Sequence, residues 1–199
     1  MKLSRLITAV PVLGAFLLLC SCASTQYKLT PQGNPTRSKT AERVTVSATF
    51  LSEDQVIAKY GEKNNPFLSP PSAFSQKKTM VFEAKVENQS PEPVFLRLSK
   101  IELQYGGRYE QPINRFHLSN FWEIRIQKND RYRYWNYGRV KNVINRTVFA
   151  NEASVTPRSA ANGTLVFMGK FPQYGQADLH IPVFLKGELV HTFRFHYQF

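Results

Sequence analysis

The sequence predicts a mainly β fold: an antiparallel β-sandwich with a partly helical insertion. Aromatic residues make up 13% of the chain and occur in short runs with Val, Ile and Leu, a composition that suits pleated sheets. Several short segments alternate apolar and polar side chains and are separated by turn residues, which is typical of antiparallel strands. The 199 residues are enough for one domain with a substantial core.

The first strand is predicted at residues 43–51, where apolar and polar side chains alternate. A short helix should follow directly. Ser52 can cap its N-terminus, Gln55 completes a capping box, and Gly61 can end it. Residues 63–75 contain three prolines and are predicted to be a loop.

The clearest strand is predicted at residues 79–88, followed by turn residues over 89–93. A second strand should occupy 94–105. Its apolar residues change parity near Ser99, which indicates either a bulge or a strand that passes from one sheet to the other. Gly106-Gly107 then turns the chain.

Residues 108–152 are predicted to be an insertion that contains helix. Four apolar residues recur there at helical spacing, namely Tyr137, Val140, Ile144 and Val148. In the first half of the insertion the pattern is ambiguous, because Trp122, Ile124 and Ile126 would suit a strand as well as a helix.

The C-terminal part is predicted to be β again. Strands are expected at 164–170, after Asn162-Gly163, and at 177–185. Pro182 lies inside the second of these, which argues for an edge strand or a bulge. Residues 188–199 should form the second arm of a hairpin, and residues 42–199 a single domain.

Two segments connect this layout to a family. Residues 81–90 read as a strand running into an Asn-x-Ser turn, and residues 162–167 as a Gly followed by an apolar strand. The layout over 43–105 and 153–199 resembles the immunoglobulin-like domains found in many uncharacterised bacterial lipoproteins. The resemblance implies an immunoglobulin-like sandwich and supplies no catalytic site.

The N-terminus has the three parts of an export signal over residues 1–21. Lys2 and Arg5 precede an apolar stretch of about 14 residues, which is too short to span a membrane as a helix. The stretch ends in Leu19-Cys20-Ser21-Cys22, which resembles the lipobox of bacterial lipoproteins. The resemblance implies that Cys22 becomes the lipid attachment site and that Cys20, which follows three leucines, is discarded with the signal peptide.

A lipidated Cys22 would make the protein a lipid-anchored component of the cell envelope, since two or more acyl chains hold a protein stably on a bilayer. Ala23, in place of the Asp that retains many lipoproteins at the inner membrane, favours the outer membrane, on either its periplasmic or its surface face. Residues 22–41 are polar and contain two prolines, so they are predicted to be a flexible tether with a reach of roughly 25 Å.

The chain is basic, with 26 Lys and Arg against 14 Asp and Glu. In an exported protein this charge makes nucleic acid an implausible partner and favours anionic lipid, anionic polysaccharide or an acidic protein. Alternatively, the charge is diffuse and serves no specific contact.

The sequence contains no motif that predicts an enzyme, a metal site or a cofactor. It lacks a Gly-x-Ser-x-Gly elbow and a glycine-rich phosphate loop. His180 and His191 could face each other across the terminal hairpin, but a zinc site needs three or four protein ligands. We therefore expect a non-catalytic protein-binding or structural module with a protein partner in the envelope.

One segment offers an alternative function. Residues 131–139 alternate cations with aromatic rings, a pattern that can stack on sugars and pair with anions. The candidate ligand-binding residues are Arg131, Arg133, Tyr134, Trp135 and Arg139. They predict binding of a glycan or of anionic lipid. If the aromatic side chains instead pack the insertion onto the sandwich, they are structural.

Overall fold

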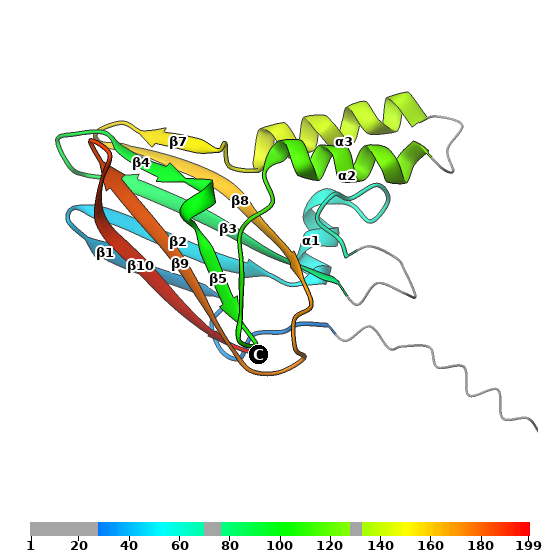
Figure 1. Ribbon diagram of the computed structural model, residues 1–199, viewed down its shortest axis with the longest axis horizontal. Helices are drawn as coiled ribbons and strands as arrows, with labels where there is room; N and C mark the ends of the chain where they lie inside the picture. Colours follow the sequence, from blue (N-terminus) through cyan, green and yellow to red (C-terminus); the bar gives the residue numbers. More distant parts are fainter. Residues whose placement is uncertain (1–27, 70–76, 128–132) are drawn as a thin grey trace, which may run out of the picture.

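The computed structural model describes residues 28–69, 77–127 and 133–199, without the side chains of residues 125–127 and 133–134. The predicted signal peptide and Cys22 lie outside the described residues. Two antiparallel sheets pack face to face, and helices cover part of one outer face (Figure 1). The predicted mainly β sandwich with a partly helical insertion is confirmed.

The first sheet has four strands in the order β1-β2-β3-β8, all antiparallel. Their bounds are β1 Thr36–Ala41, β2 Val44–Leu51, β3 Lys78–Asn88 and β8 Ser159–Gly169. In β2 and β3 the alternation seen in the sequence separates two faces, because successive side chains of a strand point to opposite sides. One face is buried against the second sheet.

The second sheet is built around its longest hairpin. Its strands are β4 Val94–Arg97, β5 Glu102–Tyr105, β6 Arg108–Glu110, β7 Glu152–Val155, β9 Gln176–Leu185 and β10 Glu188–Gln198. β10 pairs with β9 along its whole length. β4 and β5 therefore share the other edge of β9 end to end, with β7 flanking β4 and β6 flanking β5.

The parity change predicted near Ser99 corresponds to a 3-10 turn, η1 Leu98–Lys100, which separates β4 from β5 within one sheet. This interruption also explains Pro182. β9 pairs with β5 at residues 177–180 and with β4 at 184–185, so Pro182 lies opposite the break. A proline, which cannot donate a ladder hydrogen bond, is tolerated there although β9 is a central strand.

The main core fills the space between the sheets and is rich in aromatic rings. Phe82 makes edge or tilted contacts with Phe50, Phe167 and Tyr197, with ring centroids 5.2 to 5.8 Å apart. Such geometries are favourable because ring edges are positive and ring faces negative. Tyr197 also donates a hydrogen bond to the Ala48 carbonyl of the facing sheet, at 2.7 Å.

A second core lies on the outer face of the four-stranded sheet, beneath the helices. The three helices are α1 Glu53–Tyr60, α2 Arg115–Gln127 and α3 Arg133–Thr147. One row of the sheet is apolar on this face, consisting of Leu51, Val81 and Val166 in register. The helices pack on that row through side chains that include Val56, Leu118, Trp122, Val140 and Ile144.

Both helical predictions are confirmed in their essentials. Ser52 and Gln55 form the expected capping box of α1, and Gly61 follows with φ +80°. The ambiguous first half of the insertion is helical: α2 buries Leu118 and Trp122 against the sheet instead of extending as a strand.

The structure differs from the expected tether over residues 28–41. Leu29 is buried, the Lys28 ammonium pairs with Asp54 at 2.7 Å, and β1 adds an edge strand to β2. β1 was not predicted because its sequence has no apolar face. Hydroxyl pairs fasten it instead, with Thr36 Oγ1 3.0 Å from Thr49 Oγ1.

Candidate functional site

The candidate residues of segment 131–139 fall at the start of α3. Arg131 lies outside the described residues, and for Arg133 and Tyr134 the structure describes only the backbone. Trp135 and Arg139 are both exposed, and their spacing of four positions places them on one face of the helix. The structure thus brings two of the five candidate residues together.

The opposite face of α3 is structural. Val140, Ile144 and Val148 are buried in the second core, and Tyr137 packs against its edge. Burial is the main cause that raises the Tyr137 pKa, and the nearby Glu123 carboxylate of α2 adds to the shift. The predicted helical periodicity is therefore confirmed, and Trp135 does not belong to the core.

Large apolar side chains are exposed on the helical hairpin formed by α2 and α3. Trp135 is 74% exposed, Phe116 67% and Ile124 62%. Ile124 and Trp135 each lie within about one helical turn of the end where the two helices are connected. This end projects away from the strands in Figure 1.

The hairpin is also strongly cationic. Residues 115–147 contain eight Lys or Arg against two Asp or Glu, so they carry half of the chain's net charge of +12. Lys141 lies 5.9 Å from the centroid of the Tyr137 ring. Within the described part of the chain, no carboxylate pairs with Arg139 or Lys141. We call the exposed residues Ile124, Trp135 and Arg139 the hairpin surface.

A polar groove of about 490 Å³ lies at the foot of α3, and it was not predicted from the sequence. Its floor is the uncovered part of the outer face of the four-stranded sheet. Thr49, Glu83 and Thr164 form one row of this floor in register. α1 contributes Lys59 and Tyr60 to the walls, and α3 contributes Arg146. We call this cavity the sheet groove.

Hydrogen bonds order the floor of the sheet groove. The Lys59 ammonium donates to the Glu83 carboxylate, and this bond is the main cause that raises the Lys59 pKa. The Tyr60 hydroxyl donates to the same carboxylate at 3.4 Å. Burial is the main cause that raises the pKa of Tyr60. The Glu83 carboxylate is thus held in position by two donors that both come from α1.

The signal for the groove was present in the alternation of β2 and β3, where Thr49, Glu83 and Lys85 point away from the sandwich core. The sequence alone could not show that helices would cover only the apolar row of that face. From the sequence alone, these polar residues would be predicted to form an ordinary solvated face of the sheet.

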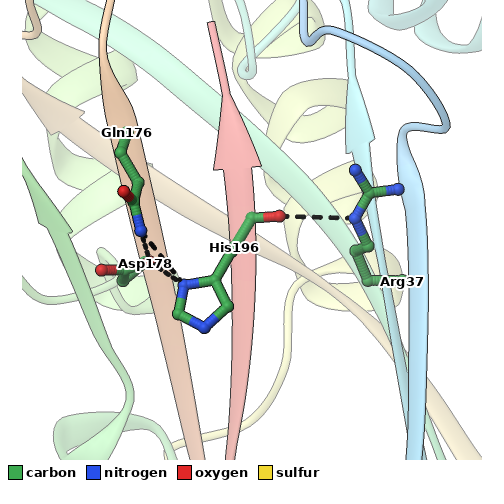
Figure 2. A network of polar contacts seen from close by, with 4 residues as sticks. All are labelled: Arg37, Gln176, Asp178 and His196. Atoms are coloured by element: carbon green, nitrogen blue, oxygen red, sulfur yellow. Dashed lines mark hydrogen bonds and ion pairs between the residues drawn. The ribbon is translucent and has the colours of Figure 1, made fainter.

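One histidine, His196, takes part in a polar network on the outer face of the six-stranded sheet. Figure 2 shows His196 Nδ1 in contact with the Asp178 carboxylate, to which Gln176 Nε2 also donates at 3.2 Å. Arg37 Nε donates to the His196 carbonyl at 3.3 Å. The network joins β9, β10 and β1.

The possible pairing of His180 with His191 is wrong. His180 lies opposite Arg194 in the hairpin, and His191 lies opposite Val183 next to a register shift. In the described residues, no three or more His, Cys, Asp and Glu side chains are grouped so that they could hold a metal ion. None of the helices described there is long and apolar enough to cross a membrane.

Comparisons with known proteins give no family. No family model matches the chain, and no curated protein matches it. Among solved structures, a proposed lipoprotein named ycdA from Bacillus subtilis subsp. subtilis str. 168 is similar, with 9% identity and a TM-score of 0.48 over 84% of this chain. The match spans 39% of that protein's length.

A second solved structure, the structural-genomics target SoR45, is similar with 10% identity and a TM-score of 0.38. That match covers 76% of this chain and 85% of the other. Both TM-scores are below 0.5, so neither similarity establishes a shared function.

Proposed function

We propose that the protein is a lipid-anchored, non-catalytic module of the cell envelope, and that the hairpin surface binds anionic lipid head groups of the membrane that carries the anchor. One observation carries the proposal. Trp135 is 74% exposed at the outer end of a cationic helical hairpin, on the same face of α3 as Arg139.

The position of the anchor supports a surface close to the bilayer. The described domain begins at Lys28, six residues after the proposed lipid attachment site at Cys22. Six residues span at most about 20 Å in any conformation. In Figure 1 the hairpin and the first described residues both lie on the right half of the view, the hairpin at the top and the first residues near the bottom. The anchor would therefore keep the whole domain near the membrane, in an orientation that the hairpin surface could select by binding head groups.

Charge complementarity supports anionic lipid as the occupant. Each Lys or Arg close to an anionic membrane surface contributes about 1 kcal/mol, and the effect fades within a Debye length of about 10 Å. The hairpin has six more cations than anions. A tether of at most about 20 Å does not fix the hairpin at this distance, but it lets the hairpin approach the head groups closely enough for this attraction to act.

The exposed apolar side chains supply a second contribution. Tryptophan is favoured at the boundary between lipid and water because its ring is apolar and its N–H can still find a partner. Ile124, near Trp135 at the connected end of the hairpin, would add apolar area. A cationic surface without exposed apolar residues would bind only through charge and would be released completely by salt.

Vesicle binding tests the proposal directly. The protein used is the chain from residue 23, which contains the whole described domain and lacks the lipid. It is mixed either with vesicles of phosphatidylcholine alone or with vesicles that also contain roughly 30% of the anionic lipid phosphatidylglycerol. We expect binding only to the anionic vesicles. W135A and R139A should each weaken it about fivefold, as the loss of about 1 kcal/mol predicts.

Matched controls use exposed residues outside the helices. Tyr174 is an exposed aromatic residue and Arg158 an exposed cation, so Y174A and R158A should bind like the parent. Equal binding by all four variants would refute the hairpin surface as the lipid site. If the chain ignored anionic vesicles but was cross-linked through position 135 to a single envelope protein, a protein partner would replace lipid as the ligand.

A further inference from the structure

The sheet groove combines features that the proposed membrane contact does not use. At about 490 Å³ it is within the range of roughly 300–1,000 Å³ typical of small-molecule sites. It lies at the opposite end of α3 from Trp135, since Arg146 and Thr147 are at the helix C-terminus. Its lining is polar, unlike the mostly apolar lining of a typical ligand pocket.

The groove offers hydroxyl and amide groups on a rigid floor. Thr49 and Glu83 stand on neighbouring strands, directly opposite each other in register, and Lys85 faces Asn162 one row further along. Strands position side chains more precisely than loops do. These groups can both donate and accept hydrogen bonds, as a ligand with several hydroxyl groups requires.

The cationic side chains around this floor differ in whether a carboxylate already pairs with them. Lys59 is paired with Glu83, and Lys85 with Glu87. Arg146 is exposed on α3, and no carboxylate of the described residues pairs with it. A guanidinium can bind a carboxylate through two parallel hydrogen bonds, so Arg146 is the group best suited to an anionic part of a ligand.

We propose that the sheet groove binds an acidic saccharide unit, with its carboxylate on Arg146 and its hydroxyl groups on Glu83, Thr49 and Asn162. Glu83 is the residue that favours an acidic saccharide over a simple anion. Its carboxylate accepts hydrogen bonds from sugar hydroxyls but repels a phosphate or sulfate placed on the same floor. An apolar ligand would leave the polar floor without partners, which is costly.

This inference is independent of the proposed membrane contact, because none of the three residues of the hairpin surface lines the groove. The experiment uses the chain from residue 23 in phosphate-free buffer, with digalacturonic acid as the probe. Galactobiose of the same linkage is the neutral control, since it differs only in having hydroxymethyl groups in place of the carboxylates. Binding is measured by calorimetry and by amide shifts in ¹H–¹⁵N spectra.

We expect digalacturonic acid to bind about tenfold more tightly than galactobiose, since charge-assisted hydrogen bonds are roughly twice as strong as neutral ones. R146Q should lower its affinity about tenfold and abolish the preference over galactobiose. E83Q, which keeps the shape of the side chain, should weaken both sugars. R97Q is the matched control: Arg97 lies in the other sheet and pairs with Glu152 at 3.4 Å.

The amide shifts locate the site even if a variant is unstable. Shifts confined to β2, β3, β8 and the end of α3 support the proposal. Shifts elsewhere, equal affinity for both sugars, or unchanged affinity in R146Q would overturn it. Full displacement of the sugar by inorganic phosphate at equal concentration would reduce the groove to a plain anion site and overturn it too. W135A should bind the sugars like the parent, which keeps this result separate from that of the vesicle assay.

Discussion

The hydroxyl of Tyr197, in the last strand, donates a 2.7 Å hydrogen bond to the backbone carbonyl of Ala48 in the facing sheet. Both residues are buried, and the bond crosses the main core between two strands that are distant in the sequence. It satisfies a hydroxyl that would otherwise be buried without a partner, which is costly. The bond therefore ties the chain's end to its first long strand.

Replacing Tyr197 by Phe should lower the free energy of unfolding by about 1 kcal/mol, the usual net value of one buried hydrogen bond. The ring contact with Phe82, 5.2 Å between centroids, should survive because the ring is unchanged. Urea denaturation followed by circular dichroism measures the loss. Y174F, at an exposed tyrosine, should unfold like the parent. A loss as large in Y174F would show that the effect does not come from the buried hydroxyl.

The same hydroxyl should make stability depend on alkaline pH. Burial raises the pKa of Tyr197 above its ordinary value, and the Arg37 guanidinium opposes the shift only partly. Above pH about 10 the unfolded chain loses this proton while the folded protein keeps it. The unfolded state then binds fewer protons, so the free energy of unfolding falls as pH rises. Below about pH 9 the contribution is constant.

The measurement compares the parent with Y197F in urea denaturation at several pH values between about 8 and 11. We expect the parent to lose stability more steeply than the variant above pH about 10, so that the difference between them shrinks. Parallel curves over this range would mean that Tyr197 ionises at the same pH in both states.

Two glycines should respond to alanine in opposite directions. A Cβ on Gly163 would lie 2.5 Å from Phe149 Cδ2, so the ring would have to move, and G163A should cost about 1–3 kcal/mol. Gly138 lies in α3 with open space around it, so G138A should stabilise the protein by about 0.5–1 kcal/mol. Thermal unfolding of both variants measures the two changes in stability. A G163A variant as stable as the parent would show that Phe149 has room to adjust.

Asn88 should be the most sensitive polar residue of the turn after β3. Its side chain is buried, donates to the carbonyls of Glu92 at 2.8 Å and Val155 at 2.9 Å, and accepts from the Ser90 amide at 2.8 Å. N88A should cost about 2–3 kcal/mol because it leaves buried groups without partners. N142A, on the exposed face of α3, should cost nothing in the same denaturation assay. Equal stability of the two variants would contradict this role.

The elements that the sequence predicted well are those whose signal is local. The capping box of Ser52 and Gln55 needs only four residues, and the alternation of β3 directly reflects its two faces. The hairpin turn at Lys186-Gly187 could also be predicted, because glycine is frequent in such turns. In the structure both residues adopt positive φ, which glycine tolerates.

The elements that the sequence missed depend on distant contacts. Asn162-Gly163 reads as a turn, yet it lies inside β8, where it pairs with Ala84 and Lys85 of β3. Glycine is needed there because the Phe149 ring occupies the space beside Gly163. Trp122 and Ile124 alternate like a strand, but α2 is helical because it packs on the apolar row of the sheet. Of the site, Trp135 and Arg139 were predicted, whereas the sheet groove arises only when α1 and α3 meet β2, β3 and β8.

Arg37 has a consequence for contacts between copies of this protein. Its Nε donates to the His196 carbonyl, and the Gln32 amide donates to the Gln198 carbonyl at 2.7 Å, so this end of β10 has its outward acceptors occupied. An exposed strand edge is a template for pairing with another chain. Lipid anchoring would confine the copies to a plane with their strands at similar heights, where edge-to-edge assembly is easiest. Capping this edge from within the same chain would keep such a crowded layer of molecules separate.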